Sequence, residues 1–365
     1  MPSRTCPAEG RRRSSSHRRL GRSYGSSAMR RLWVDSSYVG SRELHIVAAL
    51  VVSAACFNST VAVAEASFPG RNGVIAFARA VPPFGGPESV GARTIWAVKP
   101  RSARTRQLTR VPRRCGRRGW TWSDVEPSFS ASGRLVVFRH EDKCDPRSPD
   151  GIYIMRSDGS RRRLLVEDKR ADQPALSADG ETLAFDTKVG ATTYLASVRQ
   201  PDSKRELSVS GSPSVCDPSW SSTGRLALTL GVWAAHIGTV TRQGTDLQLV
   251  SRSSRDQMPD WSPDAQRIVF AREAALVHQG PGSNVLIAAV APKSQRRPRY
   301  LTRTRYAHAY FPVWSPDGRY IAFSRSRGTT VVGALWIMRA DGRRKRLIAR
   351  RIAYSRISWQ PRPRR

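Results

Sequence analysis

Six carboxylate residues lie just before or within short apolar segments that recur along the chain. Carboxylate oxygens are ligands that Ca²⁺ prefers. If the fold brings several of these residues together at the mouth of a central channel, they could hold a cation or a basic peptide. Aspartate next to proline also caps turns, so a purely structural role stays open. The candidate cation site, with calcium as its possible cofactor, comprises Asp124, Glu126, Asp172, Asp217, Asp256 and Asp260.

The segments that must position these carboxylates form a repeat. Each copy has an anchor residue, a tight turn and a short apolar strand, and successive anchors are 41 to 53 residues apart. The clearest copies are Trp261-Ser262-Pro263-Asp264 and Trp314-Ser315-Pro316-Asp317-Gly318. A period in this range indicates an array with one small sheet per copy. The anchors are Phe129, Leu176, Trp220, Trp261, Trp314 and Trp359.

The copy around Trp314 predicts four short antiparallel strands, at residues 311–314, 320–323, 335–338 and 346–349. Its turns carry Pro and Gly at positions that suit the φ angles of tight turns. Several turns depart from the pattern, and in the turn after Trp261 it is Ala265 that stands where Gly is expected. We expect either strain of about 1–2 kcal/mol or a remodelled turn at that residue.

The two ends of the array complement each other. The first strand after residue 70, at 74–77, matches the second strand of a copy and has no anchor strand before it. The last strand, at 357–361, is an anchor strand with nothing after it. The sequence therefore predicts an all-β, six-bladed β-propeller of four-stranded antiparallel blades, closed by the C-terminal strand joining the N-terminal blade.

The Trp-Ser-Pro-Asp-Gly phrase, the strands Ile321-Ala322-Phe323 and Leu335-Trp336-Ile337-Met338, and the turn Ala340-Asp341-Gly342 resemble the TolB-type β-propeller repeat. The resemblance covers about residues 70 to 361 and implies the propeller fold. Proteins of this kind include periplasmic envelope proteins and the propeller gates of prolyl-oligopeptidase-like peptidases. No Gly-x-Ser-x-Gly motif occurs here, which argues against a peptidase of the usual form.

Three segments are expected. Residues 1–28 form a disordered basic tail or an overlong predicted start, residues 29–64 a signal peptide, and residues 65–365 the propeller. The apolar run before Asn58 is too short to span a bilayer, so no transmembrane span is expected after cleavage at Ala64. A membrane anchor and lipidation at Cys56 are the alternatives. The leader indicates a secreted or cell-envelope protein.

Export permits disulfide bonds, and three cysteines follow the leader. In the blade assignment, Cys115 and Cys144 lie on loops that emerge on the same face. We expect these two to pair and Cys216 to be left over, although Cys216 could compete for either partner.

Basic residues exceed acidic residues strongly, with a net charge of +34. Such a field attracts polyanions, although solvated basic faces remain the plainer explanation. The sequence lacks the aromatic interleaving and the motifs of nucleic-acid-binding domains, which disfavours nucleic acid as a partner. The candidate polyanion site comprises Arg343, Arg344, Lys345, Arg346, Arg350 and Arg351.

The combined prediction is an exported, non-catalytic scaffold that binds an envelope protein, a cell-wall polymer or another anionic polymer at its channel mouth. The alternative is a metal-dependent hydrolase or lyase with a carboxylate-lined channel. No catalytic residue is assigned, because the histidines are scattered and no P-loop, metalloprotease or dinucleotide motif occurs.

Overall fold

The computed structural model describes residues 68–81, 92–112, 115, 121–187, 191–231, 235–273, 284–289, 297–304, 307–327 and 332–363. All of them belong to the compact unit that contains residues 64–365. The tail expected at 1–28 and the signal peptide expected at 29–64 lie outside the described residues. Within the described ranges, no helix is long and apolar enough to cross a membrane.

The described residues confirm the all-β class and the four-stranded antiparallel units. Each unit begins at a strand that carries an anchor residue and ends at an outer strand, and three units form separate sheets. These three are β8 (Ala171–Leu176), β9 (Thr182–Thr187), β10 (Thr193–Ser197) and β11 (Arg205–Glu206); β12 (Val215–Trp220), β13 (Leu226–Leu230), β14 (His236–Val240) and β15 (Gln248–Leu249); β16 (Asp256–Trp261), β17 (Arg267–Arg272), β18 (Asn284–Ala289) and β19 (Arg299–Tyr300).

The remaining strands form one larger sheet, because single bridges join its units at Arg79–Ile352 and Arg93–Ser123. Its strands are β1 (Arg71–Ala80), β2 (Arg93–Val98) and β3 (Thr105–Gln107) with β24 (Ser358–Arg362); β4 (Trp122–Phe129), β5 (Leu135–Asp142), β6 (Gly151–Arg156) and β7 (Arg163–Glu167); β20 (Ala307–Trp314), β21 (Tyr320–Arg327), β22 (Val332–Arg339) and β23 (Arg346–Ala353).

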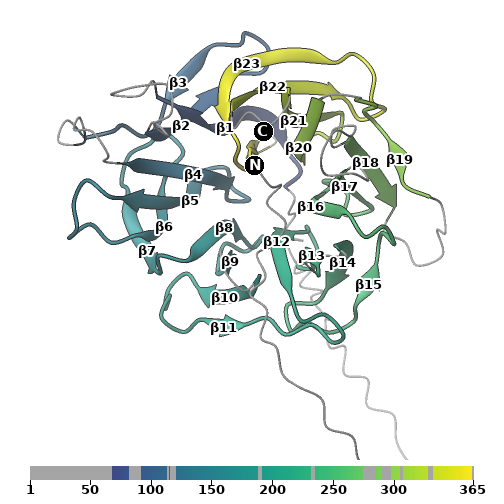
Figure 1. Cartoon of the computed structure of the whole chain (residues 1–365), viewed down its shortest axis with the longest axis horizontal. Helices are drawn as coiled ribbons and strands as arrows, with labels where there is room; N and C mark the ends of the chain where they lie inside the picture. Colours follow the sequence, from purple (N-terminus) through teal and green to yellow (C-terminus); the bar gives the residue numbers. More distant parts are fainter. Residues whose placement is uncertain are drawn as a thin grey trace, which may run out of the picture. The chain divides into compact units, whose positions relative to one another are not determined.

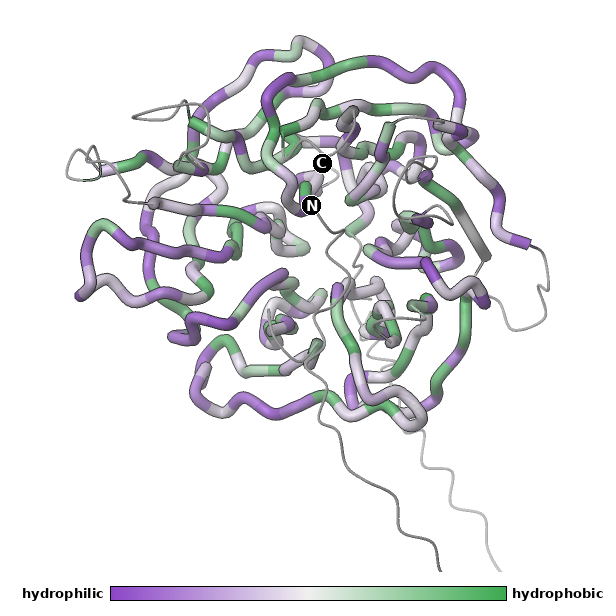
Figure 2. The backbone as a smooth tube through the Cα atoms, in the orientation of Figure 1, coloured by the Kyte–Doolittle hydropathy of each residue, from purple (hydrophilic) through white to green (hydrophobic). Residues whose placement is uncertain are grey.

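The units are arranged about a common centre (Figure 1). Strands β4, β8, β12, β16 and β20 lie nearest this centre, and the last strand of each unit lies farthest from it. Hydrophobic stretches run along the strands, whereas hydrophilic stretches occupy many of the outer connections (Figure 2). This distribution of hydropathy fits sheets that pack side by side and leave their outer edges exposed to solvent.

The two ends of the described chain pair with each other. β24 runs antiparallel to β1, with Ile75 opposite Trp359 and Asn72 opposite Pro361. Trp359 is only 6% exposed, and its neighbour Ile357 is fully enclosed in the same apolar cluster. The predicted pairing of the N-terminal and C-terminal strands is thus present.

The core lies between adjacent units rather than within any one of them. Second strands carry a fully buried phenylalanine at matching places, for example Phe138 in β5 and Phe185 in β9. One apolar cluster joins Ile95 of β2 to Phe138 and Phe129 of the next unit. A single sheet could not bury these rings alone, so each unit depends on its neighbours.

The turn at Ala265 keeps the geometry of its glycine-containing counterparts. Ala265 has φ +52°, compared with +69° at Gly318 and +73° at Gly180. The amide of Ala265 donates to the carbonyl of Ser262, as Gly318 does to Ser315. The strained form of the turn is therefore present, and the remodelled form is not.

Replacing Ala265 with Gly is expected to raise the free energy of unfolding by about 0.5–1 kcal/mol. The gain is the relief of left-handed strain, reduced by the larger chain entropy of Gly in the unfolded state. The reciprocal control is Gly318→Ala, because a Cβ there meets nothing closer than 4.0 Å and adds strain alone. Chemical denaturation measures both changes, and a destabilised Ala265→Gly variant would contradict the prediction.

Candidate functional site

The innermost strands share an irregularity that turns side chains toward the centre. In β4, β8, β12, β16 and β20 the pairing register shifts by a bulge. Each bulge holds a residue of positive φ directly before a proline, and a bulge re-aims the side chain that it carries. Proline is tolerated because these strands have a free edge. The residues of positive φ are Glu126, Gln173, Asp217, Met258 and Phe311.

The segment before β24 places Arg356 at the corresponding point, three residues before its anchor Trp359. The amide of Arg356 donates to Oε2 of Glu126 at 2.8 Å. Its guanidinium donates to Oε1 of Gln173 and to the carbonyl of Pro218, both at 3.0 Å. The C-terminal segment thus hydrogen-bonds to three inner strands through one residue.

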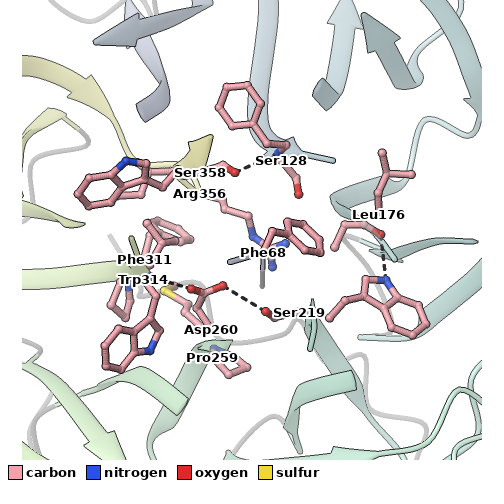
Figure 3. Close-up of a pocket in the computed structure, with 18 of the residues that line it drawn as sticks. Phe68, Ser128, Leu176, Ser219, Pro259, Asp260, Phe311, Trp314, Arg356 and Ser358 are labelled. Atoms are coloured by element: carbon pink, nitrogen blue, oxygen red, sulfur yellow. Dashed lines mark hydrogen bonds between the residues drawn. The ribbon is translucent and has the colours of Figure 1, made fainter. Parts of the chain in front are cut away.

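A cavity of about 80 Å³ lies where the inner strands meet. It has an aromatic and aliphatic wall and a few polar groups, a combination typical of small binding sites. In the close-up, the carboxylate of Asp260 lies between Trp314 and Ser219, and Arg356 extends into the same space (Figure 3). Its lining residues include Ser128, Leu176, Trp220, Met258, Phe311 and Ser358.

Asp260 is the one carboxylate among the described residues that line the cavity. The amide of Trp314 donates to its Oδ2 at 2.8 Å, and the hydroxyl of Ser219 donates to its Oδ1 at 3.2 Å. Burial raises the pKa of Asp260 to about 7, although these donors and the charge of Arg356 act in the opposite direction. Asp260 therefore changes its charge near neutral pH, inside a site that also holds an arginine.

The six predicted cation ligands do not converge on one point. Asp124 accepts hydrogen bonds from His140 Nδ1 at 2.7 Å and from Trp122 Nε1 at 2.9 Å. Asp256 forms a bidentate pair with Arg272, with distances of 2.6 and 2.8 Å. Both carboxylates are thus held by donors of their own sheets. The structure offers no common cation funnel that joins all six.

Asp217 lies in a cluster of buried carboxyl groups that also contains Asp172 and Asp186. The sequence did not single out Asp186. The amide of Asp217 donates to Oδ2 of Asp186 at 3.0 Å, and Asp186 lies opposite Asp172 in the pairing of β8 with β9. Burial, reinforced by the charges of Asp172 and Asp217, raises the pKa of Asp186 well above its usual range. These carboxyls repel one another, so protonation of Asp186 relieves the repulsion.

Among the described residues, two groups have ligand atoms close enough to share an ion: Cys115, Asp142 and Cys144, and Asp186, Cys216 and Asp217. All three cysteines are disulfide-bonded, so none offers a thiolate ligand. Only Asp217 of the predicted cation ligands belongs to either group. The geometry therefore favours structural roles for most of the carboxylates.

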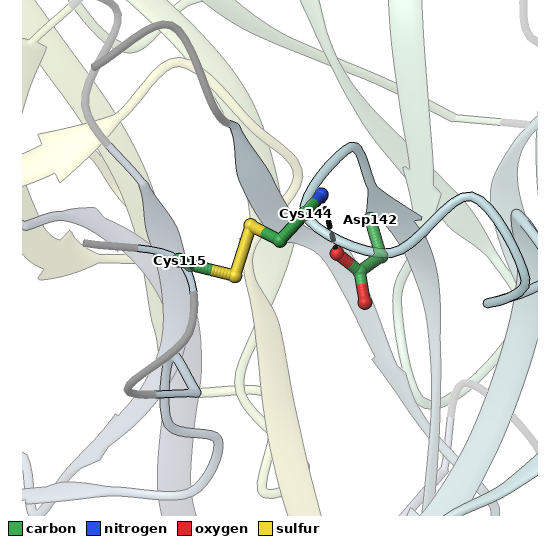
Figure 4. Close-up of side chains that lie close together, drawn as sticks. All are labelled: Cys115, Asp142 and Cys144. Atoms are coloured by element: carbon green, nitrogen blue, oxygen red, sulfur yellow. Dashed lines mark hydrogen bonds between the residues drawn. A yellow bond between two sulfur atoms is a disulfide. The ribbon is translucent and has the colours of Figure 1, made fainter. Parts of the chain in front are cut away.

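Cys115 and Cys144 form a disulfide bond, with an S–S distance of 2.04 Å (Figure 4). The amide of Cys144 donates to Asp142 at 2.8 Å, and Trp122 lies against the pair. The bond ties the approach to β4 to the loop after β5. Cys216 is also disulfide-bonded, which corrects the expectation that it is left over.

The six candidate polyanion ligands are exposed, at the turn before β23 and along β23 itself. They lie on an outer strand, away from the central cavity (Figure 1). The cationic surface and the cavity are therefore separate. The cavity is lined by Arg356, which hydrogen-bonds to Gln173, and we predicted neither residue. A signal for both was present, because each lies three residues before an anchor.

The comparisons with known proteins concern the fold. No family model matches the chain, and no curated protein matches it by sequence. The structure of TolB from Acinetobacter baumannii matches with a TM-score of 0.60 at 15% identity, covering 79% of this chain and 67% of TolB. Putative TolB from Agrobacterium tumefaciens matches with a TM-score of 0.54 at 13% identity, covering 79% of this chain and 99% of the other.

A chain of the nidogen/laminin complex is similar to the same extent, with a TM-score of 0.55 at 10% identity, over 80% of this chain and 99% of the other. Identities this low show a shared architecture and leave the activity open. The anchors, the four-stranded antiparallel units and the pairing of the terminal strands all agree with these matches. The chain therefore has the β-propeller fold of TolB.

Proposed function

We propose that this protein is an exported, six-bladed propeller, closed by its C-terminal strand, that serves as a non-catalytic binding scaffold. Its partner is an envelope protein or a cell-wall polymer that inserts a group into the central cavity. The observation that carries the proposal is the cavity itself. Its walls come from β4, β8, β12, β16, β20 and the β24 segment, which are the inner strands of six units.

The size and polarity of the cavity limit what it can accept. A volume of about 80 Å³ suits one small side chain or the end of a polymer unit, so the rest of the partner would lie over the mouth. Arg356 and Asp260 offer a cation and a titratable acid, and Ser128 and Ser219 lie beside them. A polar group carried on an apolar stem fits this lining.

The hydrogen bonds that two of the inner-strand carboxylates already make within the protein support a scaffold role. A metal-dependent hydrolase or lyase needs carboxylates free to coordinate an ion, whereas Asp124 and Asp256 are held by His140 and Arg272. Export is supported by the Cys115–Cys144 bond, because such bonds persist in oxidising compartments.

The proposal is tested by filling the cavity. Ser128→Phe adds a ring at the cavity wall, whereas Ser203→Phe adds the same ring at an exposed turn between β10 and β11. Each variant is immobilised and exposed to envelope extract, and the captured components are quantified by mass spectrometry. We expect at least one component to be lost about tenfold or more with Ser128→Phe and kept with Ser203→Phe.

Equal capture by both variants and the unmodified protein, with unchanged melting temperatures, would show that the cavity binds no partner. If Ser128→Phe unfolds, the smaller change Ser128→Val makes the same comparison against Ser203→Val.

A further inference from the structure

The outer strand of one unit runs along its neighbour at the boundary where the two ends of the chain meet. β23 bridges to β1 at Ile352 and Arg79. Near the other end of β23, the guanidinium of Arg346 donates to the carbonyl of Pro100, in the turn between β2 and β3, at 2.6 Å. In the cartoon, β23 runs beside the first unit along this boundary (Figure 1). We call it the basic seam, comprising Arg79, Lys99, Arg101, Arg346, Arg350 and Arg351.

Among the described residues of its two units, the basic seam has no carboxylate partner. Within the described parts of the two units (68–81, 92–112, 307–327 and 332–363), the only acidic residues are Asp317 and Asp341. Each of these accepts a backbone hydrogen bond within its own turn, from Arg319 and Arg343. No residue of the basic seam forms an ion pair within those described ranges.

Some arginines on other described units do have carboxylate partners. Arg225 pairs with Asp246 at 2.6 Å, Arg242 with Asp179 at 2.7 Å and Arg199 with Glu181 at 3.4 Å. These pairs lie in the units formed by β8–β11 and β12–β15. In those units carboxylates offset part of the basic charge, whereas the described parts of the two units at the seam hold only Asp317 and Asp341.

Arg79 lies at the end of the seam where β23 bridges to β1, and part of its hydrogen-bonding capacity is unused. Its guanidinium lies over the ring of Trp96 at 4.4 Å, and its buried Nε has no hydrogen-bond partner. Burial, and then the charge of Arg351, lower the pKa of Arg79. Two neighbouring guanidinium groups without a carboxylate repel each other, and a bound anion would remove that repulsion.

The backbone of β23 is distorted at the same place. Gly333 pairs with Ile352 and Ala334 with Arg350, so Arg351 is left out of the ladder by a bulge. Arg351 has φ +57°, a conformation that costs a non-glycine residue about 1–2 kcal/mol. The bulge leaves both Arg350 and Arg351 exposed, where a regular strand would turn one of them inward.

We propose that the basic seam binds a linear polyanion, a polymer with repeated phosphate or carboxylate groups, laid along β23 across the boundary between the two units. Arginine dominates the seam, and its planar fork binds both groups in a bidentate manner. An eight-residue strand is about 26 Å long, so several repeating groups can be bound at once. This site is separate from the central cavity, and its test does not depend on the proposed function.

The test is the binding of inorganic polyphosphate and of polygalacturonate to the full chain, measured by titration over a series of salt concentrations. Arg351→Asn removes one charge and keeps a residue that tolerates positive φ. Arg161→Asn is the matched control, because Arg161 is exposed and has φ +53° in a turn of another unit. Arg79→Met keeps an apolar stem over Trp96 and removes the second charge.

We expect Arg351→Asn and Arg79→Met each to weaken binding of at least one polymer about five- to tenfold. Each should also reduce the slope of log affinity against log salt by about 1, whereas Arg161→Asn should change the affinity less than twofold. Equal losses in all three variants would assign binding to the general charge and overturn the proposal. The absence of binding to either polymer at low salt would overturn it as well.

Discussion

Removing residues 354–365 is expected to lower the melting temperature of the whole propeller by about 10 °C or more. The truncation deletes β24 and with it the buried ring of Trp359, whose loss alone costs about 3–5 kcal/mol. It also removes the hydroxyls of Ser355 and Ser358, which accept hydrogen bonds from the amides of Glu126 and Phe129. A loss of 5 kcal/mol or more corresponds to the expected shift in a domain of this size.

The control for this truncation is a chain that ends at Arg362. It keeps every residue of β24 and loses only the three residues after it. Calorimetry should show one cooperative transition near that of the complete protein for the control. An unchanged transition in the longer truncation would mean that β24 does not hold the ring together.

The second large effect concerns pH and Asp260. The pKa of Asp260 is about 7 in the folded protein and about 4 in an unfolded chain. Between these values the folded state binds more protons than the unfolded state, so stability falls as the pH rises through that window and levels off above about 7. Replacing Asp260 with Asn removes this loss.

We expect Asp260→Asn to gain about 2 kcal/mol over the unmodified protein between pH 5 and pH 8. The full pKa difference would give about 4 kcal/mol, but the cavity lets solvent reach the carboxylate and weakens the penalty. Asp186 has a raised pKa as well, so part of the pH dependence should persist in the variant.

Denaturant titrations at pH 5 and pH 8 measure the gain. Asp246→Asn serves as the control, because its exposed carboxylate pairs with Arg225 and its pKa is lowered, which places its titration below this window. Parallel pH profiles for Asp260→Asn and the unmodified protein would contradict the assignment of a raised pKa to Asp260.

Most of the fold could be predicted because its signals are local. The Trp314 copy contains a turn with Pro, Asp and Gly, and the strand after it begins at Tyr320, as expected. The unmatched strand at 74–77 and the unmatched anchor Trp359 together indicated the terminal pairing. Each of these inferences needs only a few neighbouring residues and the repeat period.

The candidate site was less predictable, because a bulge interrupts the alternation of side chains along each inner strand. Before the bulge, Asp124 and Asp256 lie opposite His140 and Arg272 on the next strand and are hydrogen-bonded to them. At or after the bulge, Glu126 hydrogen-bonds to Arg356 and Asp260 reaches the cavity. The usual alternation of side chains along a strand cannot distinguish these two groups of carboxylates. The extra residue of the bulge moves every later side chain to the opposite face of the sheet.

The role of Arg356 depends on a contact between distant parts of the chain. It is 230 residues from Glu126, with which it forms a hydrogen bond. Its place three residues before Trp359 was visible, but the other copies have proline after this position, whereas Arg356 precedes Ile357. Recognising it required the distance to the anchor rather than the residue type.

In the closed propeller proposed for this chain, the C-terminal strand completes the first unit and thereby encloses the cavity. The most direct measurement is an engineered cross-link between Arg71→Cys and Arg362→Cys, because these exposed residues are opposite each other in β1 and β24. Cα atoms of paired residues in antiparallel strands lie about 4.5–5.5 Å apart, which suits a disulfide bond. We expect mass spectrometry of the oxidised double variant to find the two peptides linked within one molecule; free thiols, or links only between molecules, would contradict the closure.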